Sequence, residues 1–350
     1  MVRLQAWSWC LTLLAATSTS GCVQAALSSP VEAARAGHPV GPEAVDDSMV
    51  CRTLADRFIG LPATAQAWPE GGDEALRPST GRWWVRTCSA RARGPDLQVH
   101  LEGPGWYWVD ATANGMAVKQ QVPFQLQLTL TGRLREGATN GVLSLWLEPS
   151  AEPVVLVEAP PELEVHTTNA WGDLLRVVPG VSPARRAAQR FNQELTEAFR
   201  TQLQAGATLT YELGSGQSDA TLGRLAPGKT PRHLFEDEAT WLVNDRVVLP
   251  PASAQVLGPL DPGSLNVNVI VERGPGLTYH AVCRDTLERN FEAIALGALS
   301  RVPASAWLGG GTMMGSGERT ATLRVTGCKF YLVLATVEPA STLAAVRIRS

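Results

Sequence analysis

The sequence has 350 residues, of which 45% are hydrophobic and 18% are charged, and its formal net charge is −3. That length predicts two domains, and the hydrophobic fraction is typical of a globular protein with a large core. A slightly acidic chain has no electrostatic reason to bind nucleic acid, so we expect no nucleic-acid partner.

Residues 1–21 are predicted to be an export signal peptide. Arg3 supplies the positive start, and the segment 6–16 is an apolar core too short to span a bilayer as a mature helix. Small residues follow it. No later stretch is long and apolar enough for a transmembrane helix, so we expect the rest of the chain to be exported.

The signal ends in the run Thr19-Ser20-Gly21-Cys22. This run resembles the lipobox of bacterial lipoproteins, with Thr19 where Leu is usual. The resemblance implies lipidation of Cys22 and attachment to a membrane of the cell envelope. The alternative is ordinary cleavage after Ala25, which would give a periplasmic or secreted protein, and a third reading is a retained anchor. Residues 22–45 are rich in Ala, Pro and Gly and are predicted to be a flexible tether.

Cys10 lies in the signal and Cys22 is expected to be lipidated or removed, so four cysteines remain, and four cysteines allow three pairings. Proximity in sequence favours Cys51 with Cys88 and Cys283 with Cys328. A four-thiolate metal site is disfavoured because no C-x-x-C spacing occurs, so we expect no metal. Disulfides fit an exported protein.

Residues 46–252 are predicted to form an α+β domain with an antiparallel meander sheet. A short helix is expected from Asp46 or Asp47 to Ile59, and a strand over 82–91 with its arginines facing solvent. Alternating apolar residues predict strands over 97–101, 106–109 and 124–134, with further strands over 142–147, 154–157 and 163–165. Turns are expected at Gly103-Pro104-Gly105, Asn114-Gly115 and Asn140-Gly141.

One long amphipathic helix is predicted over about 183–205. Ser182 is a good N-cap, Pro183 suits the first helical position and Gly206 suits the end. Its apolar residues fall at three-four spacing and predict one buried face, for which the sheet is the available partner. A strand begins near Leu209, and a strand pair is expected over 241–243 and 247–249.

Residues 253–350 are predicted to form a smaller, mostly β domain. Strict alternation over 265–271 precedes a second Gly-Pro-Gly, at 274–276, which we interpret as another hairpin turn. Asp285 and Glu288 have capping-box spacing for a helix. Further strands are expected over 321–325, 330–337 and 343–348.

Two glycine-rich motifs are interpreted as coincidences. The run Gly223–Thr230 matches the P-loop pattern, but Pro231 disfavours the helix that the motif needs, so we expect no nucleotide. The run Gly309–Gly317 lacks the following helix of a dinucleotide loop and is expected to be a flexible connection. No cofactor is expected.

No catalytic motif is recognised, and we expect no enzyme. His100, His166, His233 and His280 are scattered singly, and the acidic triplet 236–238 has no metal-ligand spacing. An exported hydrolase assembled from distant residues, such as His100 or His280 with acidic partners, stays as a third hypothesis.

The aromatic residues on the predicted sheet are the one feature of the sequence that suggests a binding site. They suit either stacking on sugars or a place in the core under the long helix. The candidate ligand-binding residues are Trp83, Trp84, Trp106, Trp108 and Trp146. The leading hypothesis is a non-enzymatic module that encloses an apolar ligand between helix and sheet. The alternative is a glycan-binding module that uses exposed tryptophans.

Overall fold

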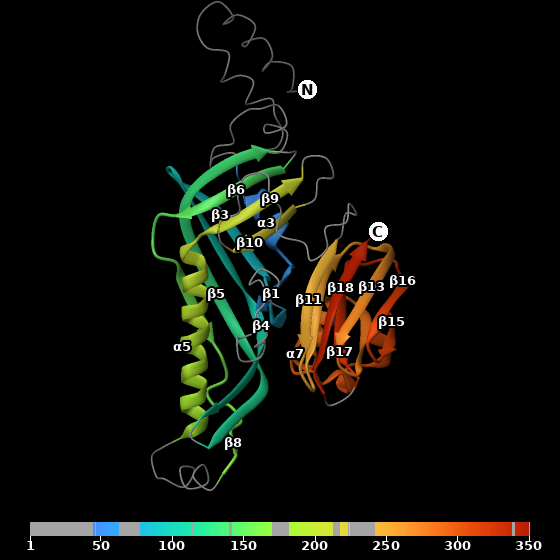
Figure 1. Ribbon diagram of the computed structural model, residues 1–350. Helices are drawn as coiled ribbons and strands as arrows, with labels where there is room; N and C mark the ends of the chain where they lie inside the picture. The colour runs from blue at the N-terminus through green and yellow to red at the C-terminus, as the bar shows by residue number, and fades with distance from the viewer. Residues whose placement is uncertain are drawn as a thin grey trace, which may run out of the picture.

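The computed structural model describes residues 45, 47–62, 78–113, 115–139, 142–169, 182–212, 218–222, 224, 242–337 and 340–349. In these ranges the chain is mostly β, and one helix of 22 residues lies along the first part of it (Figure 1). The expected α+β fold is therefore matched in part, since strands dominate and the long helix is present.

The elements of the first part are α3 (Asp47–Leu54), β1 (Phe58–Pro62), β2 (Ser79–Trp84), β3 (Thr87–Arg93), β4 (Asp96–Ala113), β5 (Met116–Thr139), β6 (Val142–Pro149), β7 (Val154–Glu158), β8 (His166–Thr167), α5 (Pro183–Gln204), β9 (Ala207–Glu212) and β10 (Ser218–Leu222). Those of the second part are β11 (Val243–Leu249), β12 (Ala254–Leu260), β13 (Gly263–Arg273), β14 (Gly276–Cys283), α6 (Arg284–Arg289), α7 (Phe291–Ala295), η2 (Leu299–Arg301), η3 (Ala304–Ala306), β15 (Trp307–Met314), β16 (Gly317–Val325), β17 (Phe330–Thr336) and β18 (Thr342–Arg349).

A 14-stranded sheet runs through both parts in the order β10-β9-β6-β5-β4-β2-β11-β18-β13-β16, with β1, β3, β7 and β8 paired off this path. Its pairs are antiparallel except for β2 with β11, which meet at Ser79 and Val247. A second sheet has the order β12-β17-β14-β15. The domain boundary predicted at 252 stays a prediction. Strand β11 precedes this position in the chain, but it pairs with β18 and is grouped with the second part.

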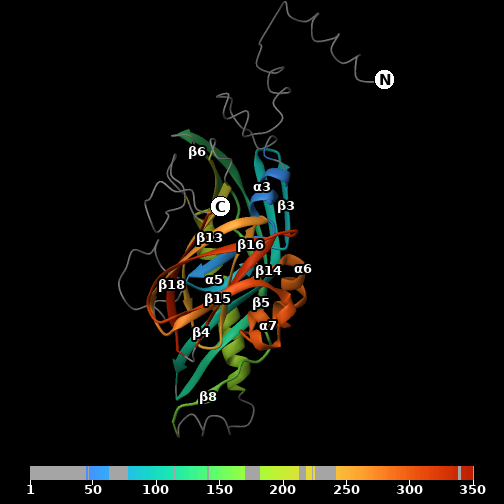
Figure 2. The same cartoon turned by 90° about the vertical axis from the view of Figure 1, so that its right-hand side faces the viewer.

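The second part is a β-sandwich. Strands β11, β18, β13 and β16 of the large sheet pack against the four-stranded sheet, and alternate residues from both meet in one apolar core. Figure 2 shows this sandwich facing the viewer, with α6 and α7 at its flank. The outer face of the four-stranded sheet is buried against these helices and against aromatic residues of the first part: Phe58, Trp84 and Trp106.

The segment Gly103-Pro104-Gly105 is not a turn, because β4 runs through it and pairs with β5 from Asp96 to Ala113 without a shift. A Cβ at Gly103 would lie 1.8 Å from the carbonyl oxygen of Trp84. The glycine is needed for close approach of the neighbouring chain and not for a reversal of direction.

Pro104 is tolerated inside β4 because the partner strand changes at this point along the edge of β4 that does not face β5. On this edge, Glu102 pairs with Thr87 of β3, and Gly105 pairs with Trp83 of β2. The carbonyl of Glu102 accepts from the amide of Arg86, so Pro104, two residues on, faces the same side, at the break between β3 and β2. A missing N–H costs little where no ladder partner stands opposite.

The second Gly-Pro-Gly is not a hairpin either, since β13 and β14 belong to different sheets. Gly274 and Gly276 have φ angles of 115° and 124°, which let the chain step from one sheet to the other. The glycine-rich run predicted as a flexible connection holds β15, and only Gly315 and Ser316 link it to β16.

Several element boundaries were predicted wrongly. The first helix ends at Leu54, and Phe58 begins a strand. The strand over 82–91 is divided into β2 and β3, the two strands expected over 241–249 are the single strand β11, and 163–165 is not a strand. Asp285 does not cap α6, which begins at Arg284 without a side-chain cap; Glu288 pairs with Arg86 instead.

Candidate functional site

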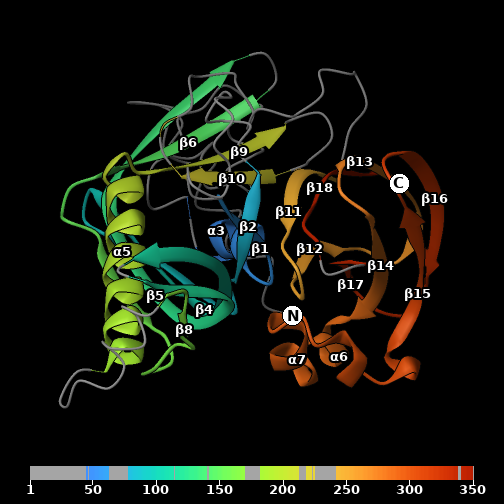
Figure 3. The same ribbon diagram turned by 60° about the horizontal axis from the view of Figure 1, so that its bottom comes forward.

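The long helix α5 covers the inner face of the first part of the sheet (Figures 1 and 3). The hydroxyl of Ser182 accepts from the amide of Arg185 at 3.3 Å, and Gly206 follows the helix with φ 80°, so the predicted start and end are both confirmed. The helix buries four side chains: Ala188, Phe191, Phe199 and Leu203.

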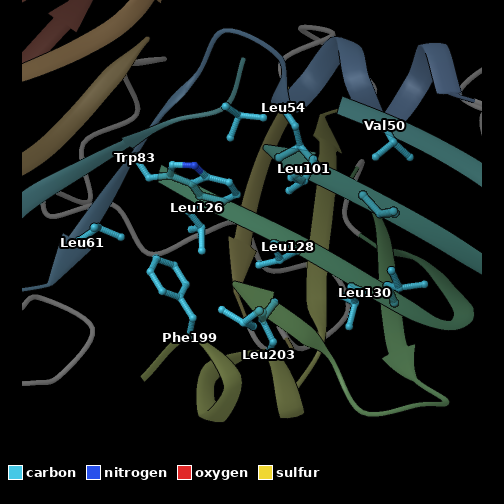
Figure 4. Packing of buried hydrophobic residues seen from close by; sticks show 14 of the residues in the cluster. Val50, Leu54, Leu61, Trp83, Leu101, Leu126, Leu128, Leu130, Phe199 and Leu203 are labelled. Carbon is cyan, nitrogen blue, oxygen red and sulfur yellow. The ribbon is translucent and has the colours of Figure 1, made fainter. Parts of the chain in front are cut away.

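Alternate residues of the long β4–β5 hairpin form the opposite wall. The odd-numbered residues Leu97, Val99 and Leu101 of β4 and the even-numbered residues Leu126, Leu128 and Leu130 of β5 are all buried in one cluster with the helix. Period-two alternation places them on one face, as the sequence predicted. Figure 4 shows Phe199 and Leu203 reaching from α5 toward this wall.

A cavity of about 80 Å³ lies inside this cluster. Its lining is entirely apolar and comes from helix α3, the sheet and the end of α5: Val50, Leu54, Ile59, Trp83, Leu97, Val99, Leu101, Leu128, Leu130, Leu134, Leu145, Leu147, Phe199, Leu203, Ala207, Leu209 and Ala220. A polar group placed there would lose its hydration without gaining a hydrogen-bond partner. The space can therefore accept only an apolar group.

A groove of about 140 Å³ follows the flank of α5 beside this cavity. Its lining is apolar except at the rim, where two polar residues stand: Leu61, Tyr107, Phe191, Leu195, Ala198 and Phe199, with Glu194 and Gln202. Glu194 is held by Arg190, whose Nε donates to its carboxylate at 2.6 Å. The groove thus combines an apolar floor with a polar edge.

Phe199 lines both spaces and stands between them. Its ring meets the indole of Trp83 edge-on, with centroids 6.1 Å apart and an interplanar angle of 74°. The indole Nε1 of Trp83 donates to the carbonyl of Gly103 at 3.2 Å, which fixes that ring. The helix side chain is therefore the boundary between the groove and the cavity.

Three of the five candidate tryptophans are buried, with at most 1% of the side chain exposed: Trp83, Trp84 and Trp106. Trp84 stacks between Phe58 and Phe291 at 5.3 and 5.6 Å. Trp106 donates to the carbonyl of Ala254 at 3.0 Å. None of the three leaves a ring face for a sugar, so the structure gives the glycan hypothesis no stacking platform at these residues.

Trp108 and Trp146 are half-buried and lie on different strands, β4 and β6. Trp146 donates to the carbonyl of Ala205 at 3.1 Å, and the guanidinium of Arg224 lies 4.3 Å above its ring. Trp146 thus serves to join β6 to the end of α5.

The three histidines in the described ranges, His100, His166 and His280, are not brought together. His100 Nδ1 lies 3.0 Å from Thr129 Oγ1 on the large sheet, while the His280 ring lies 4.7 Å from that of Trp307 on the other sheet. Burial lowers the pKa of His280 below its ordinary value. His166, on β8, lies 3.6 Å from Glu164 at the surface. His233, the acidic triplet 236–238 and the P-loop-like run, apart from Arg224, lie outside the described residues.

Sequence reasoning missed a buried arginine. Arg82 is 1% exposed, although its strand was expected to turn its arginines to solvent. Its Nη1 lies 2.7 Å from Asp245 Oδ2, and its Nε donates to Gln255 Oε1 at 2.7 Å. The three residues come from β2, β11 and β12, so this polar cluster joins the first part of the chain to the sandwich.

Both predicted disulfides are confirmed. Cys51 is bonded to Cys88, and Cys283 to Cys328, with Cα atoms 5.4 and 5.9 Å apart. Two disulfides indicate an oxidising, extracellular environment. In the described ranges, no helix is long and apolar enough to cross a membrane, and no cluster of three or more His, Cys, Asp or Glu residues could hold a metal ion. The lipidation predicted for Cys22 lies outside these ranges.

Comparison with known proteins gives no family. No family model matches, and no curated protein matches. Among solved structures, the pre-peptidase C-terminal domain of a collagenase from Bacillus anthracis is 14% identical over 31% of this chain and 84% of that chain, with a TM-score of 0.17. A glycoside hydrolase family 43 arabinoxylan arabinofuranohydrolase from Bacillus subtilis, in complex with cellotetraose, is 10% identical over 76% and 66%, with a TM-score of 0.21. The secreted serine protease VesC from Vibrio cholerae is 10% identical over 83% and 67%, also at 0.21. Likenesses this weak carry no argument about fold or function.

Proposed function

We propose that the protein is a non-enzymatic binding module of the cell envelope that holds one apolar, chain-like ligand between α5 and the sheet. The observation that carries the proposal is the wholly apolar cavity under α5, with the apolar groove beside it. Ligand sites are concave and mostly apolar, with a few polar groups at the mouth. Glu194 and Gln202 supply such a polar rim.

The shape of the two spaces favours a narrow ligand. The residues that line them on α5 run from Phe191 to Leu203, and twelve steps of 1.5 Å along the helix place these two residues about 18 Å apart. A cavity of 80 Å³ is too small for a bulky ring system but is similar in scale to engineered apolar cavities that take up small hydrophobic molecules. A flexible acyl chain fits this arrangement when it lies in the groove and its end displaces the ring of Phe199 to enter the cavity.

The test is equilibrium binding of a radiolabelled medium-length fatty acid, which serves as the probe, to the purified full chain. We expect A198W to abolish uptake, because Ala198 lines the groove and is exposed, so a large ring there obstructs entry without changing the core. The matched control is Q193W, an exposed position on the same helix that does not line the groove.

A second pair of variants tests the cavity itself. L128F fills it, and L126F, on the same strand and equally buried but not in the lining, is the control for overpacking. Probe binding that is lost in L128F and A198W but kept in L126F and Q193W supports the proposal. Equal binding by all four variants would contradict it.

We also infer that the protein is attached to a membrane through a lipid on Cys22. The support is the lipobox-like run and the tether that follows it, together with the two disulfides of an exported chain. Radiolabelled palmitate should enter the wild type and not C22A. A wild-type protein that takes up no label would overturn the anchor and leave ordinary secretion.

A further inference from the structure

A polar hollow lies on the outer face of the first part of the sheet, the face of β3, β4 and β5 that points away from α5. Its volume is about 280 Å³, and five side chains line it: Ser89, Arg91, Gln98, His100 and Thr129. Figure 4 shows the opposite, apolar face of the same sheet, where Leu101, Leu128 and Leu130 point toward the interior. The sheet therefore separates this hollow from the groove and the cavity under α5.

The strand register brings the five side chains together. Across the sheet, Ser89 of β3 pairs with His100 of β4, and His100 pairs with Thr129 of β5. In the next row on the same face, Arg91 pairs with Gln98. Because cross-strand partners and residues two apart on a strand point to the same face, the five polar groups converge on one place.

The β3 side of the hollow is fixed from behind. Cys88 and Ala90 alternate with the two lining residues of β3, Ser89 and Arg91, and so point to the inner face. There Ala90 is 4% exposed, and a disulfide joins Cys88 to Cys51 of helix α3. A wall held in this way needs little reordering when a ligand binds.

Hydrogen bonds hold the centre of the hollow but leave polar groups unused. His100 Nδ1 lies 3.0 Å from Thr129 Oγ1, and the amide Nε2 of Gln98 donates to Thr131 Oγ1 at 3.3 Å. The second ring nitrogen of His100 and the hydroxyl of Ser89 have no hydrogen-bond partner within the described ranges. These groups are available to a ligand.

Arg91 makes the hollow positive. Among the residues that the structure describes, no carboxylate forms an ion pair with its guanidinium. The acidic residues on this face of β4 lie outside the lining: Asp96, whose carboxylate accepts from the hydroxyl of Ser150 at 2.8 Å, and Glu102. A lining with one positive charge and no negative charge favours an anionic ligand.

We propose that this hollow binds an acidic saccharide, that is, a sugar that carries a carboxylate or a phosphate. The guanidinium of Arg91 can donate two parallel hydrogen bonds to either group. The hydroxyls of Ser89 and Thr129 and the amide of Gln98 both donate and accept, which matches the hydroxyls of a sugar. Val154 of β7 pairs with Thr129 and is 55% exposed, so it offers an apolar surface to the C–H groups of the ring.

Saturation-transfer difference NMR of the purified full chain with glucuronate, glucose 6-phosphate and glucose tests this. We expect at least one of the two acidic sugars to bind, and to bind at least about tenfold more tightly than glucose, because only the acidic group gains a charge-assisted hydrogen bond. The acidic sugar that binds more tightly identifies the group that Arg91 recognises. R91Q should weaken the binding of that sugar at least about tenfold for the same reason.

The matched control is R93Q, which makes the same change at an exposed arginine two residues along β3 that does not line the hollow. It should bind the acidic sugar as the wild type does, and near-ultraviolet circular dichroism should show that both variants are folded. R91Q should also keep its affinity for the fatty-acid probe, since the two sites lie on opposite faces of the sheet.

Three results would overturn the proposal. The first is a wild type that binds neither acidic sugar, whether or not it binds the fatty acid. The second is a wild type that binds glucose as tightly as the acidic sugars. The third is a pair of variants, R91Q and R93Q, that bind the acidic sugar equally.

Discussion

The guanidinium of Arg82 and the carboxylate of Asp245 meet at 2.7 Å although 163 residues separate them in the chain. Arg82 is almost fully buried, while Asp245 is 31% exposed. The strands that carry them, β2 and β11, are also the only pair through which the large sheet continues from the first part into the sandwich, as far as the described residues show. The ion pair therefore lies at the joint between the two parts.

Removing one member of this pair should destabilise the protein strongly. D245N leaves the buried guanidinium without a counter-charge, and we expect a loss of about 3 kcal/mol in the free energy of unfolding, measured by urea denaturation. The matched control is E148Q, which breaks the exposed pair of Glu148 with Arg135 and should cost between about 0 and 1 kcal/mol. Equal losses in the two variants would contradict a special role for Arg82.

The disulfide of the second part should matter for stability because it closes a loop of 45 residues. The pair C283S/C328S is expected to lower the free energy of unfolding by about 3–4 kcal/mol, mainly by freeing the unfolded chain. Thermal unfolding with and without a reducing agent checks this. The agent should lower the melting temperature of the wild type more than that of the variant, which keeps only Cys51–Cys88. An equal shift in both would place the whole effect in the first bridge.

Stability should fall in mildly acidic solution because of His280. Partial burial beside Trp307 lowers the pKa of His280 in the folded state, so the unfolded chain binds a proton first as the pH falls. Unfolding is therefore favoured progressively as the pH drops through about 6.5, the ordinary histidine value, and the loss levels off below the folded-state pKa. H280Q should remove this part of the pH dependence. A variant curve parallel to the wild type between pH 7 and pH 5 would contradict it.

Local sequence patterns predicted the elements whose causes are local. Helix α5 has its cap, its proline and its closing glycine within its own sequence. The β4–β5 hairpin follows from the alternation of apolar and polar residues, and its two strands are joined by residues 114 and 115, where the Asn-Gly turn was predicted. The disulfides followed from proximity along the chain. In each case the determining contacts lie within a few tens of residues.

The errors arose where a distant strand decides. From the sequence, Gly103 was predicted to be a turn residue, but in the structure it packs against the backbone of Trp84. Arg82 was predicted to face solvent, but it is buried and paired with Asp245 of β11. The sequence held one signal for Arg82, because it is the only charged residue of the run Ser-Thr-Gly-Arg-Trp-Trp. The structure buries every position of this run. The apolar cavity had a weaker signal, since the helix stripe predicted a covered face but not a space beneath it.

Phe199 gives the last prediction, because it should affect stability and ligand uptake in opposite directions. F199A removes the ring that separates the groove from the cavity, and the loss of a buried phenylalanine is expected to cost about 3–5 kcal/mol. The same change joins the two spaces into one, so the folded fraction should bind the fatty-acid probe more tightly. The control is F291A, which removes an aromatic ring packed on Trp84 in a different cluster and should not raise probe affinity. Weaker probe binding by folded F199A would mean that the ring itself is part of the site and does not close it.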